Sequence, residues 1–196
     1  MTIPPTLLPP LEDGIQESDR KNVQLESYNG SVDATVILVN DGKIPTKRTT
    51  VSVQTQHGSV TARLVRLILS LSYRYLIGSQ HAPAERPAIQ LNAASYNGAV
   101  AVYLPRSFRG FLTLSSKNGS IVFSDAVAAQ VATFSHVGLT KRCFMGVIAD
   151  ALQDVGEWSG DEVVASSHNG KIRVFYVDEA KASKTSPGFF ARMFGS

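Results

Sequence analysis

Histidine, cysteine and paired acidic residues are the side chains of this 196-residue sequence that could carry chemistry. Two of the four histidines, His57 and His168, stand at or beside glycine-containing turns, so they would share one edge if the turns stack. A metal or catalytic histidine needs further groups at a defined geometry, and no HExxH, GxSxG or phosphate-loop pattern is present. We therefore interpret these histidines as solvent-exposed turn residues.

A single cysteine, Cys143, excludes an internal disulfide and a cysteine-rich zinc site. The preceding arginine could stabilise a thiolate, but a strand-like setting favours a small buried apolar residue. The acidic pairs Asp150/Asp154 and Asp161/Glu162 could serve acid–base chemistry or calcium binding, yet they share one acidic loop without ligand-loop spacing. We expect no catalytic residue, no cofactor and no metal ligand.

The composition is that of a folded protein with an unevenly distributed charge. Apolar residues make up 43% of the sequence and charged residues 18%, which excludes a disordered chain. The formal net charge is +3, and the segment from Lys43 to Lys117 holds ten basic residues against one acid, Glu85. Outward-facing strand charges explain this basic middle better than a nucleic-acid site does. We expect no nucleic-acid partner and at most weak binding of an anionic polymer.

Both ends of the chain read as extensions of one domain. Prolines crowd the first ten residues, and the last sixteen residues lack a pattern that could pair. We expect a disordered leader over 1–21, a single all-β domain over 22–180 and a disordered basic tail over 181–196. No secretory signal and no apolar stretch of roughly 18 residues is visible, so we expect no membrane span and a cytoplasmic or nuclear location.

Five segments of the chain repeat one pattern around a glycine. Each reads apolar-x-apolar-x-Ser/Thr-x-Asn/His-Gly-x-apolar-x-apolar. Alternation with a period of two predicts two half-buried strands, and Asn-Gly between them is a strong turn signal. The turn residues that we assign are Asn29, Gly30, His57, Gly58, Asn97, Gly98, Asn118, Gly119, Asn169 and Gly170.

A type I′ turn with Asn and Gly at its centre would pair the two strands of each unit as a hairpin. Ser27 would then lie opposite Val32, and Leu25 opposite Ala34. Such a turn also predicts a positive φ angle at each glycine, for example at Gly119.

Alternation outside the repeats predicts further strands. Leu67 to Ile77 alternates apolar and polar residues within the wide gap between the second and third repeat glycines, and we interpret it as a strand, with a helix as the alternative. Weaker patterns predict strands over Gln130 to Val137 and Lys141 to Ile148. Between Asp150 and Asp161 we expect an acidic loop that is anchored by Trp158.

Two all-β architectures fit these units. In the first, which we prefer, the units stack as the rungs of a β-solenoid or toast-rack, with the Asn-Gly turns in a row along one corner. In the second, the units are hairpins of an antiparallel meander or sandwich. Both remain open from the residues alone.

An ordered set of motifs resembles a known family over roughly Val23 to Glu179. Besides the Ser-x-Asn-Gly turns, the motifs are Val102–Gly110, Arg142–Gly146, Trp158–Asp161 and Lys171–Glu179. They resemble a fungal family of uncharacterised proteins, of the type named domain of unknown function 7330, and depart from it at 64–80 and at His57. A weaker likeness to bacterial toast-rack and adhesin-head domains implies stacked β-rungs. The resemblance brings no catalytic residue and no known activity.

From these observations we expect a non-enzymatic β-repeat domain that acts as a scaffold or binding module for a protein or carbohydrate partner. The alternative is a protein that binds or acts on polysaccharide, because stacked β-rungs also host carbohydrate chemistry. A cleft with two carboxylates about 5 to 9 Å apart would favour an enzyme. A smooth surface with only polar turn residues would favour a scaffold.

Overall fold

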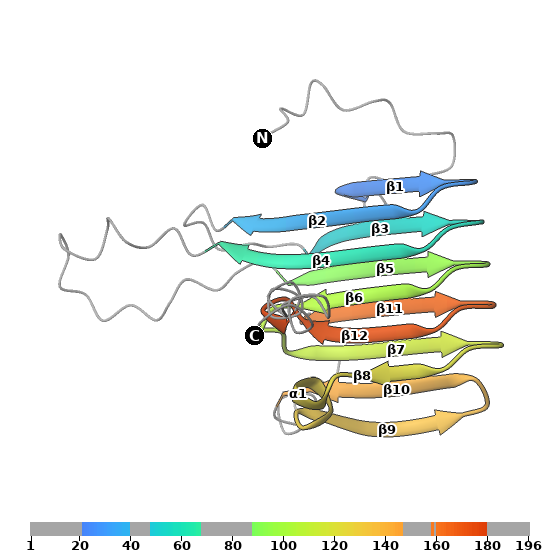
Figure 1. Cartoon of the computed structure of the whole chain (residues 1–196). Coiled ribbons are helices and arrows are strands. Elements are labelled where there is room, and N and C mark those ends of the chain that lie inside the picture. Colours follow the sequence, from blue (N-terminus) through green and yellow to red (C-terminus); the bar gives the residue numbers. More distant parts are fainter. Residues whose placement is uncertain (1–20, 40–47, 68–87, 147–157, 159, 180–196) are drawn as a thin grey trace, which may run out of the picture.

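Two β-sheets face each other in the computed structural model, and they are built from a stack of two-strand rungs (Figure 1). The structure describes residues 21–39, 48–67, 88–146, 158 and 160–179. Sheet A has seven strands, in the spatial order β1 (Val23–Ser27), β3 (Thr49–Thr55), β5 (Ile89–Ser95), β11 (Asp161–Ser167), β7 (Gly110–Ser116), β10 (Thr140–Met145) and β9 (Val131–Val137). Sheet B has five, in the order β2 (Val32–Val39), β4 (Val60–Leu67), β6 (Val100–Leu104), β12 (Ile172–Tyr176) and β8 (Ile121–Phe123). A short helix, α1 (Asp125–Ala128), follows β8.

A rung consists of one strand of sheet A, a bend, and the next strand of the chain, which belongs to sheet B. Rungs I to IV are β1–β2, β3–β4, β5–β6 and β7–β8 in chain order, and rung V is β11–β12. Equivalent strands of neighbouring rungs pair in parallel, so that Val51 of rung II lies beside Val23 and Leu91. The all-β prediction is confirmed, and the units stack as rungs instead of forming a meander of hairpins.

Alternation along each strand builds the core between the two sheets. Residues of β5, β7 and β11 switch strictly between buried and half-buried. The parallel register gathers buried side chains with 0% exposure into columns, which are Val51, Leu91, Val163 and Leu112 in sheet A and Val60, Val100 and Ile172 in sheet B. Burying one such side chain contributes about 1.5–3 kcal/mol, so this packing holds the rungs in register.

Rung V enters the stack out of chain order. In sheet A, β11 lies between β5 and β7, and in sheet B, β12 lies between β6 and β8. The buried carboxylate of Asp161 helps to seat this rung, because its oxygens accept hydrogen bonds from the backbone N–H groups of Ile89 (3.2 Å) and Arg109 (3.1 Å). The last described segment therefore fills a slot between rungs that precede it in the sequence.

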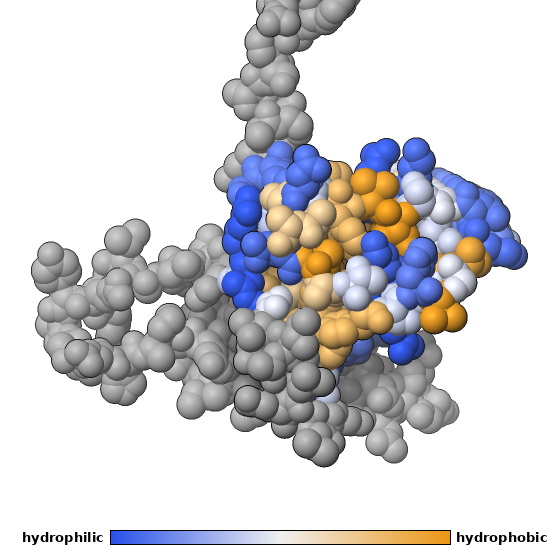
Figure 2. Space-filling view, turned by 90° about the horizontal axis from the view of Figure 1, so that it is seen from below, coloured by the Kyte–Doolittle hydropathy of each residue, from blue (hydrophilic) through white to orange (hydrophobic). Residues whose placement is uncertain are grey.

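The antiparallel hairpin β9–β10 extends sheet A beyond the last rung. Its strands confirm, within the described residues, those predicted over Gln130 to Val137 and Lys141 to Ile148. Gly138 has a φ angle of 58° and begins the two-residue loop between them, as in a type II′ turn. Figure 2 looks at this end of the stack and shows apolar side chains among polar ones. The exposed large apolar residues of β8, β9 and the hairpin loop are Val122, Phe134, Val137 and Leu139.

Two details of the predicted turn are wrong. The strands of one unit do not pair with each other, because Ser27 lies beside Thr55 and Leu25 beside Val53 of the neighbouring rung. None of the five repeat glycines, Gly119 included, has a positive φ angle. The bend at each glycine directs the chain from sheet A to sheet B and not back along the same sheet, so a type I′ reversal is not needed.

Several predictions fall outside the described residues. These are the strand at Leu67 to Ile77 beyond its first residue, the leader up to residue 20, the tail, and the acidic loop up to residue 157. Trp158, the expected anchor of that loop, packs edge-on against Phe111 and Phe144, with ring centroids 5.2 and 5.5 Å away. Its Nε1 also donates a hydrogen bond to the carbonyl oxygen of Asp161 (2.9 Å).

Candidate binding site

The five bends form a row along one edge of the stack, at the right in Figure 1, which we call the corner. In spatial order the corner comprises residues 28–30, 56–58, 96–98, 168–170 and 117–119. A Cβ atom on Gly98 would overlap the carbonyl oxygen of Gly58, and one on Gly170 would overlap that of Gly98. The close approach of neighbouring rungs, and not a left-handed backbone, requires glycine at these positions.

A hydroxyl group three residues before each glycine satisfies the polar backbone of the corner. Ser95 Oγ accepts a hydrogen bond from the N–H of Gly98 (2.8 Å) and donates one to the carbonyl of Gly58 in the neighbouring rung (2.7 Å). Ser167 and Ser116 make the same two bonds, each with its own glycine and with the glycine of the next rung. An unsatisfied buried polar group costs about 1–3 kcal/mol, which explains the Ser/Thr of the motif.

In four of the five rungs, the residue before the glycine contributes to a second ladder at the exposed tip of the corner. Nδ2 of Asn118 donates to Oδ1 of Asn169 (2.7 Å), and Nδ2 of Asn169 donates to Oδ1 of Asn97 (2.7 Å). Nδ2 of Asn97 in turn donates to Nδ1 of His57 (2.8 Å). His57 therefore continues the asparagine ladder, and these turn residues bind one another across rungs.

The residue two positions before each glycine projects from the corner, and together these residues form a row that we call the wall. In spatial order the wall is Tyr28, Gln56, Tyr96, His168 and Lys117. Tyr96 stacks on His168 with ring centroids 4.4 Å apart and an interplanar angle of 21°, and Tyr28 meets His57 edge-on at 5.3 Å. The side chains of Tyr28 and Tyr96 are 66% and 47% exposed. The wall thus holds aromatic rings against fixed neighbours while leaving them open to solvent.

Next to the wall, outward-facing residues of sheet A form a second row that we call the floor. The parallel register aligns Glu26, Gln54, Ala94, Ser166 and Ser115 across the rungs. The floor residues beside the rings of Tyr96 and His168 are small, namely Ala94 and Ser166, and the surface between wall and floor is hollowed into a groove of about 680 Å³. The groove is lined by residues from all five rungs.

The groove is polar, nearly neutral and aromatic along one side. Its acid is Glu26 in rung I and its ammonium is Lys117 in rung IV, at opposite ends of the two rows. The amide and hydroxyl groups between them can both donate and accept hydrogen bonds. Glu26 is the one carboxylate among the described lining residues, so the groove does not present the pair of acids that glycoside hydrolysis needs.

The remaining residues considered in the sequence take structural positions. Cys143 is fully buried in β10, with its Sγ 3.6 Å from Oγ1 of Thr133, which agrees with its interpretation as a small core residue. Asp161 binds backbone N–H groups as described above, and Glu162 accepts a hydrogen bond from Arg48 (3.0 Å). Their expected companions at positions 150 and 154 lie outside the described residues.

Two arginines of the basic middle, Arg48 and Arg63, meet acids from other rungs. Arg48 pairs with Glu162 of rung V across 3.0 Å, and Arg63 of rung II pairs with Asp33 of rung I. These pairs agree with outward-facing strand charges. They give an anionic polymer less free cationic surface than the sequence count suggests.

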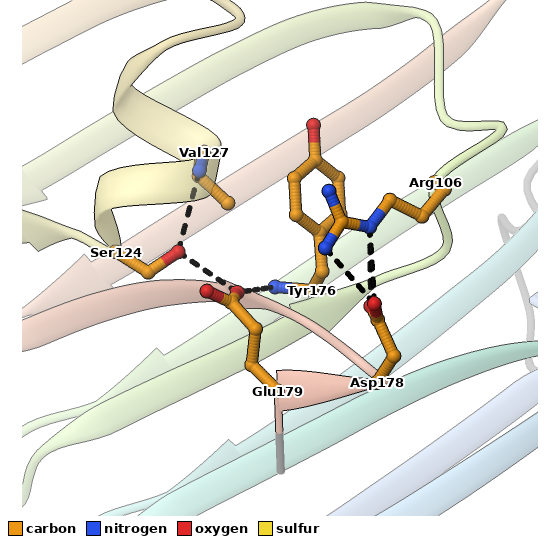
Figure 3. A network of polar contacts seen from close by, with 6 residues as sticks. All are labelled: Arg106, Ser124, Val127, Tyr176, Asp178 and Glu179. Atoms are coloured by element: carbon orange, nitrogen blue, oxygen red, sulfur yellow. Dashed lines mark hydrogen bonds and ion pairs between the residues drawn. The ribbon is translucent and has the colours of Figure 1, made fainter. Parts of the chain in front are cut away.

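A cluster of polar contacts, which we call the clasp, joins rung V to its surroundings at the end of β12 (Figure 3). Arg106 donates hydrogen bonds to Oδ2 of Asp178 from Nη2 (2.9 Å) and Nε (3.1 Å), and its guanidinium lies 4.1 Å from the ring centre of Tyr176. The carboxylate of Glu179 accepts hydrogen bonds from the N–H of Tyr176 (2.6 Å) and from Oγ of Ser124 (2.8 Å). Ser124 is also the N-cap of α1, a helix that the sequence analysis did not predict.

Charges in the clasp shift its pKa values in opposite directions. The hydrogen bond from Arg106 holds the pKa of Asp178 below its ordinary value, and the same bond raises the pKa of Arg106. Burial raises the pKa of Tyr176. Because both partners of the ion pair are exposed, we interpret the clasp as a structural connection and not as a chemical site.

The sequence analysis singled out His168 among the wall residues, and it missed the rest of the wall and the floor. It assigned the Asn-Gly pairs but passed over the position before them, because tyrosine, glutamine, lysine and histidine share no chemical type. Only the parallel register turns this position into one continuous row. The available signal was positional, since these five residues stand at the same place in each aligned repeat.

Within the ranges that the structure describes, no group of three or more His, Cys, Asp or Glu side chains is placed to hold a metal ion. The helix α1 has four residues, and the same described ranges contain no helix that is long and apolar enough to cross a membrane.

Comparisons with known proteins identify a family but no activity. No curated protein matches the sequence significantly. A crystal structure described as that of a "putative cell adhesion protein" from Clostridium sporogenes is 9% identical, with 83% of this chain and 96% of that chain covered and a TM-score of 0.35. At this TM-score the similarity carries no argument about function. The family model described as domain of unknown function DUF7330 matches residues 1–179, and the chain therefore belongs to the DUF7330 family.

Proposed function

We propose that the protein is a non-catalytic binding module that holds an extended ligand in the groove on sheet A. One observation carries this proposal. The wall and the floor run side by side over five rungs and together line one groove of about 680 Å³. Ligand sites combine concave shape with a few placed polar groups and aromatic surface, and this groove has all three. Because paired strands hold the rows, little ordering entropy is lost on binding.

Binding explains the exposed wall better than a purely structural scaffold does. A scaffold needs the buried hydroxyls and the close glycines of the corner, but it has no use for tyrosines that are 66% and 47% exposed. An enzyme acting on polysaccharide has less support, because Glu26 is the one carboxylate among the described residues of the groove.

Filling the groove tests this proposal directly. Ser166 lies in the middle of the floor, so Ser166→Trp should occupy the hollow without touching the core. The full chain and this variant are applied to an array of neutral polysaccharides, charged polysaccharides and extended peptides. We expect the wild type to retain a ligand that the Ser166→Trp variant loses.

The matched control is Arg173→Trp, which adds the same side chain to an exposed position of β12 on sheet B. It should leave binding unchanged. Failure of the wild type to bind any member of the array, or equal binding by the Ser166→Trp variant, would contradict the proposal. Shortening of a bound polymer during the assay would show an enzyme instead.

A further inference from the structure

We infer that the groove binds a neutral, unbranched polysaccharide, an inference that rests on the proposed function and names its ligand class. The polar lining is the first argument. Gln54, Gln56 and Ser166 present amides and a hydroxyl that can each donate and accept, as the hydroxyl groups of a sugar do. The hydroxyl groups of a sugar can therefore pair with this lining either as donors or as acceptors.

The charge of the groove favours a neutral ligand. Glu26 and Lys117 stand at opposite ends of the two rows, four rungs apart in the stack, and their formal charges cancel. The floor between them consists of Gln54, Ala94 and Ser166, none of which is ionisable. An anionic polymer would meet Glu26 and would lack a series of cations to follow.

The aromatic side chains favour a flat repeating unit with apolar C–H faces. Tyr96 is braced by His168 at 4.4 Å, and Tyr28 by His57 at 5.3 Å, so neither ring must be ordered on binding. Tyrosine offers a large amphipathic contact at low entropic cost. Pyranose rings expose C–H faces that pack on such rings while their hydroxyl groups bind the polar neighbours.

The spacing of the tyrosines favours a polymer over a single sugar. Tyr28 belongs to rung I and Tyr96 to rung III, so they stand two strand spacings apart, about 9.5 Å along the stack. This length matches two linked pyranose rings, and a straight polymer lying along the groove would meet both tyrosines. A monosaccharide could contact only one.

A peptide strand fits the groove less well. Peptides add to sheets through an open edge, where backbone groups are free to pair. The floor crosses the faces of β1, β3, β5, β11 and β7, and each of these strands except β1 is already paired on both sides. Recognition here must come from side chains, which suits a ligand that carries many hydroxyl groups.

Titration calorimetry on the full chain tests this inference with neutral hexasaccharides of β-1,3-glucan, β-1,4-glucan and β-mannan. We expect at least one of them to bind, and the corresponding monosaccharide to bind more weakly because it can contact only one of the two tyrosines. Tyr96→Ala should weaken binding by about tenfold or more, the usual effect of losing a central aromatic contact. Tyr96→Phe keeps the ring and should retain most of the affinity.

The matched control is Tyr103→Ala, which removes an equivalent stacked tyrosine from sheet B, where Tyr103 lies on Phe175 with ring centroids 5.2 Å apart. Binding by this variant should stay within about twofold of wild type, since Tyr103 does not line the groove. Absence of binding to every neutral hexasaccharide, or equal binding by the Tyr96→Ala variant, would overturn the inference. If only polygalacturonate or a polyproline peptide binds and Ser166→Trp abolishes that binding, the proposed binding module is supported and its assignment to a neutral polysaccharide is wrong. If no ligand binds, both the proposed function and this inference are wrong.

Discussion

The corner and the β9–β10 hairpin both turn the chain at glycine, but for different physical reasons. At the corner, Gly98 has no positive φ angle, and the carbonyl group of Gly58 in the next rung leaves no room for a Cβ atom. At the hairpin, Gly138 has a φ angle of 58°, and an added Cβ atom would meet no heavy atom within 4 Å. Gly98 is required because the neighbouring rung comes too close for a Cβ atom. Gly138 is required because its backbone has a positive φ angle.

This difference determines how far a substitution acts. A corner glycine belongs to a column, so an added carbon must separate two rungs that are paired on both sheets. A substitution at Gly138 changes one loop at the end of sheet A. The requirement for glycine therefore arises from the stacking of rungs at the corner and from a single turn at the hairpin.

The largest effect is expected for Gly98→Ala. The added methyl group would overlap backbone of rung II, which cannot rotate away as a side chain can. We expect a loss of about 3 kcal/mol or more in the free energy of unfolding, at the upper end of overpacking effects. Urea unfolding followed by circular dichroism measures it.

Gly30→Ala is the matched control for this prediction. Gly30 has the same place in rung I, but no rung lies beyond it in the described stack, and an added Cβ would meet only Oγ of Ser27, at 3.1 Å. Its cost should stay below about 1 kcal/mol. Equal costs at Gly30 and Gly98 would show that close stacking is not what requires glycine at the corner.

A smaller effect is expected for Gly138→Ala in the hairpin. Alanine in the left-handed region costs about 1–2 kcal/mol, and asparagine tolerates this region better. Gly138→Ala should therefore destabilise by about 1 kcal/mol and Gly138→Asn by less. Hydrogen exchange should accelerate in β9 and β10 while β5 and β11 remain protected. A Gly138→Asn variant that loses as much as Gly138→Ala would indicate a steric cause, as at the corner.

The strands could be predicted from the sequence because their signal is local. Alternation of apolar and polar residues over a few positions predicts which side chains of β5 or β7 face the core. The pairing could not be read in this way, because Val51 beside Val23 depends on residues that are distant in the chain. Asn-Gly favours a hairpin turn in isolation, and the packing of two apolar sheets overrides that preference.

The groove depends on information that no single repeat contains. Tyr96 stacks on His168 only because rung V lies beside rung III, although rung IV follows rung III in the sequence. The order of the rungs is set by contacts such as those of Asp161 with Ile89 and Arg109. These contacts join segments with no shared pattern, so the aligned repeats could indicate the rows but not the order within them.

In the clasp, an ion pair takes the place that backbone packing has at the corner, and we expect the smallest effect there. The lowered pKa of Asp178 means that its ion pair with Arg106 favours folding above the ordinary aspartate pKa of about 3.9. This contribution is lost as the pH falls through the lower pKa of the folded state. A double-mutant cycle of Asp178→Asn and Arg106→Gln, followed by urea unfolding, should give a small favourable coupling at pH 7 that shrinks toward zero below about pH 3.

The cost of Gly98→Ala should be the same at both pH values, because no charge takes part in the contact with Gly58. A coupling that persists in acid would assign the clasp to neutral hydrogen bonding. A cost of Gly98→Ala that varies with pH would show that a charged group also acts at the corner.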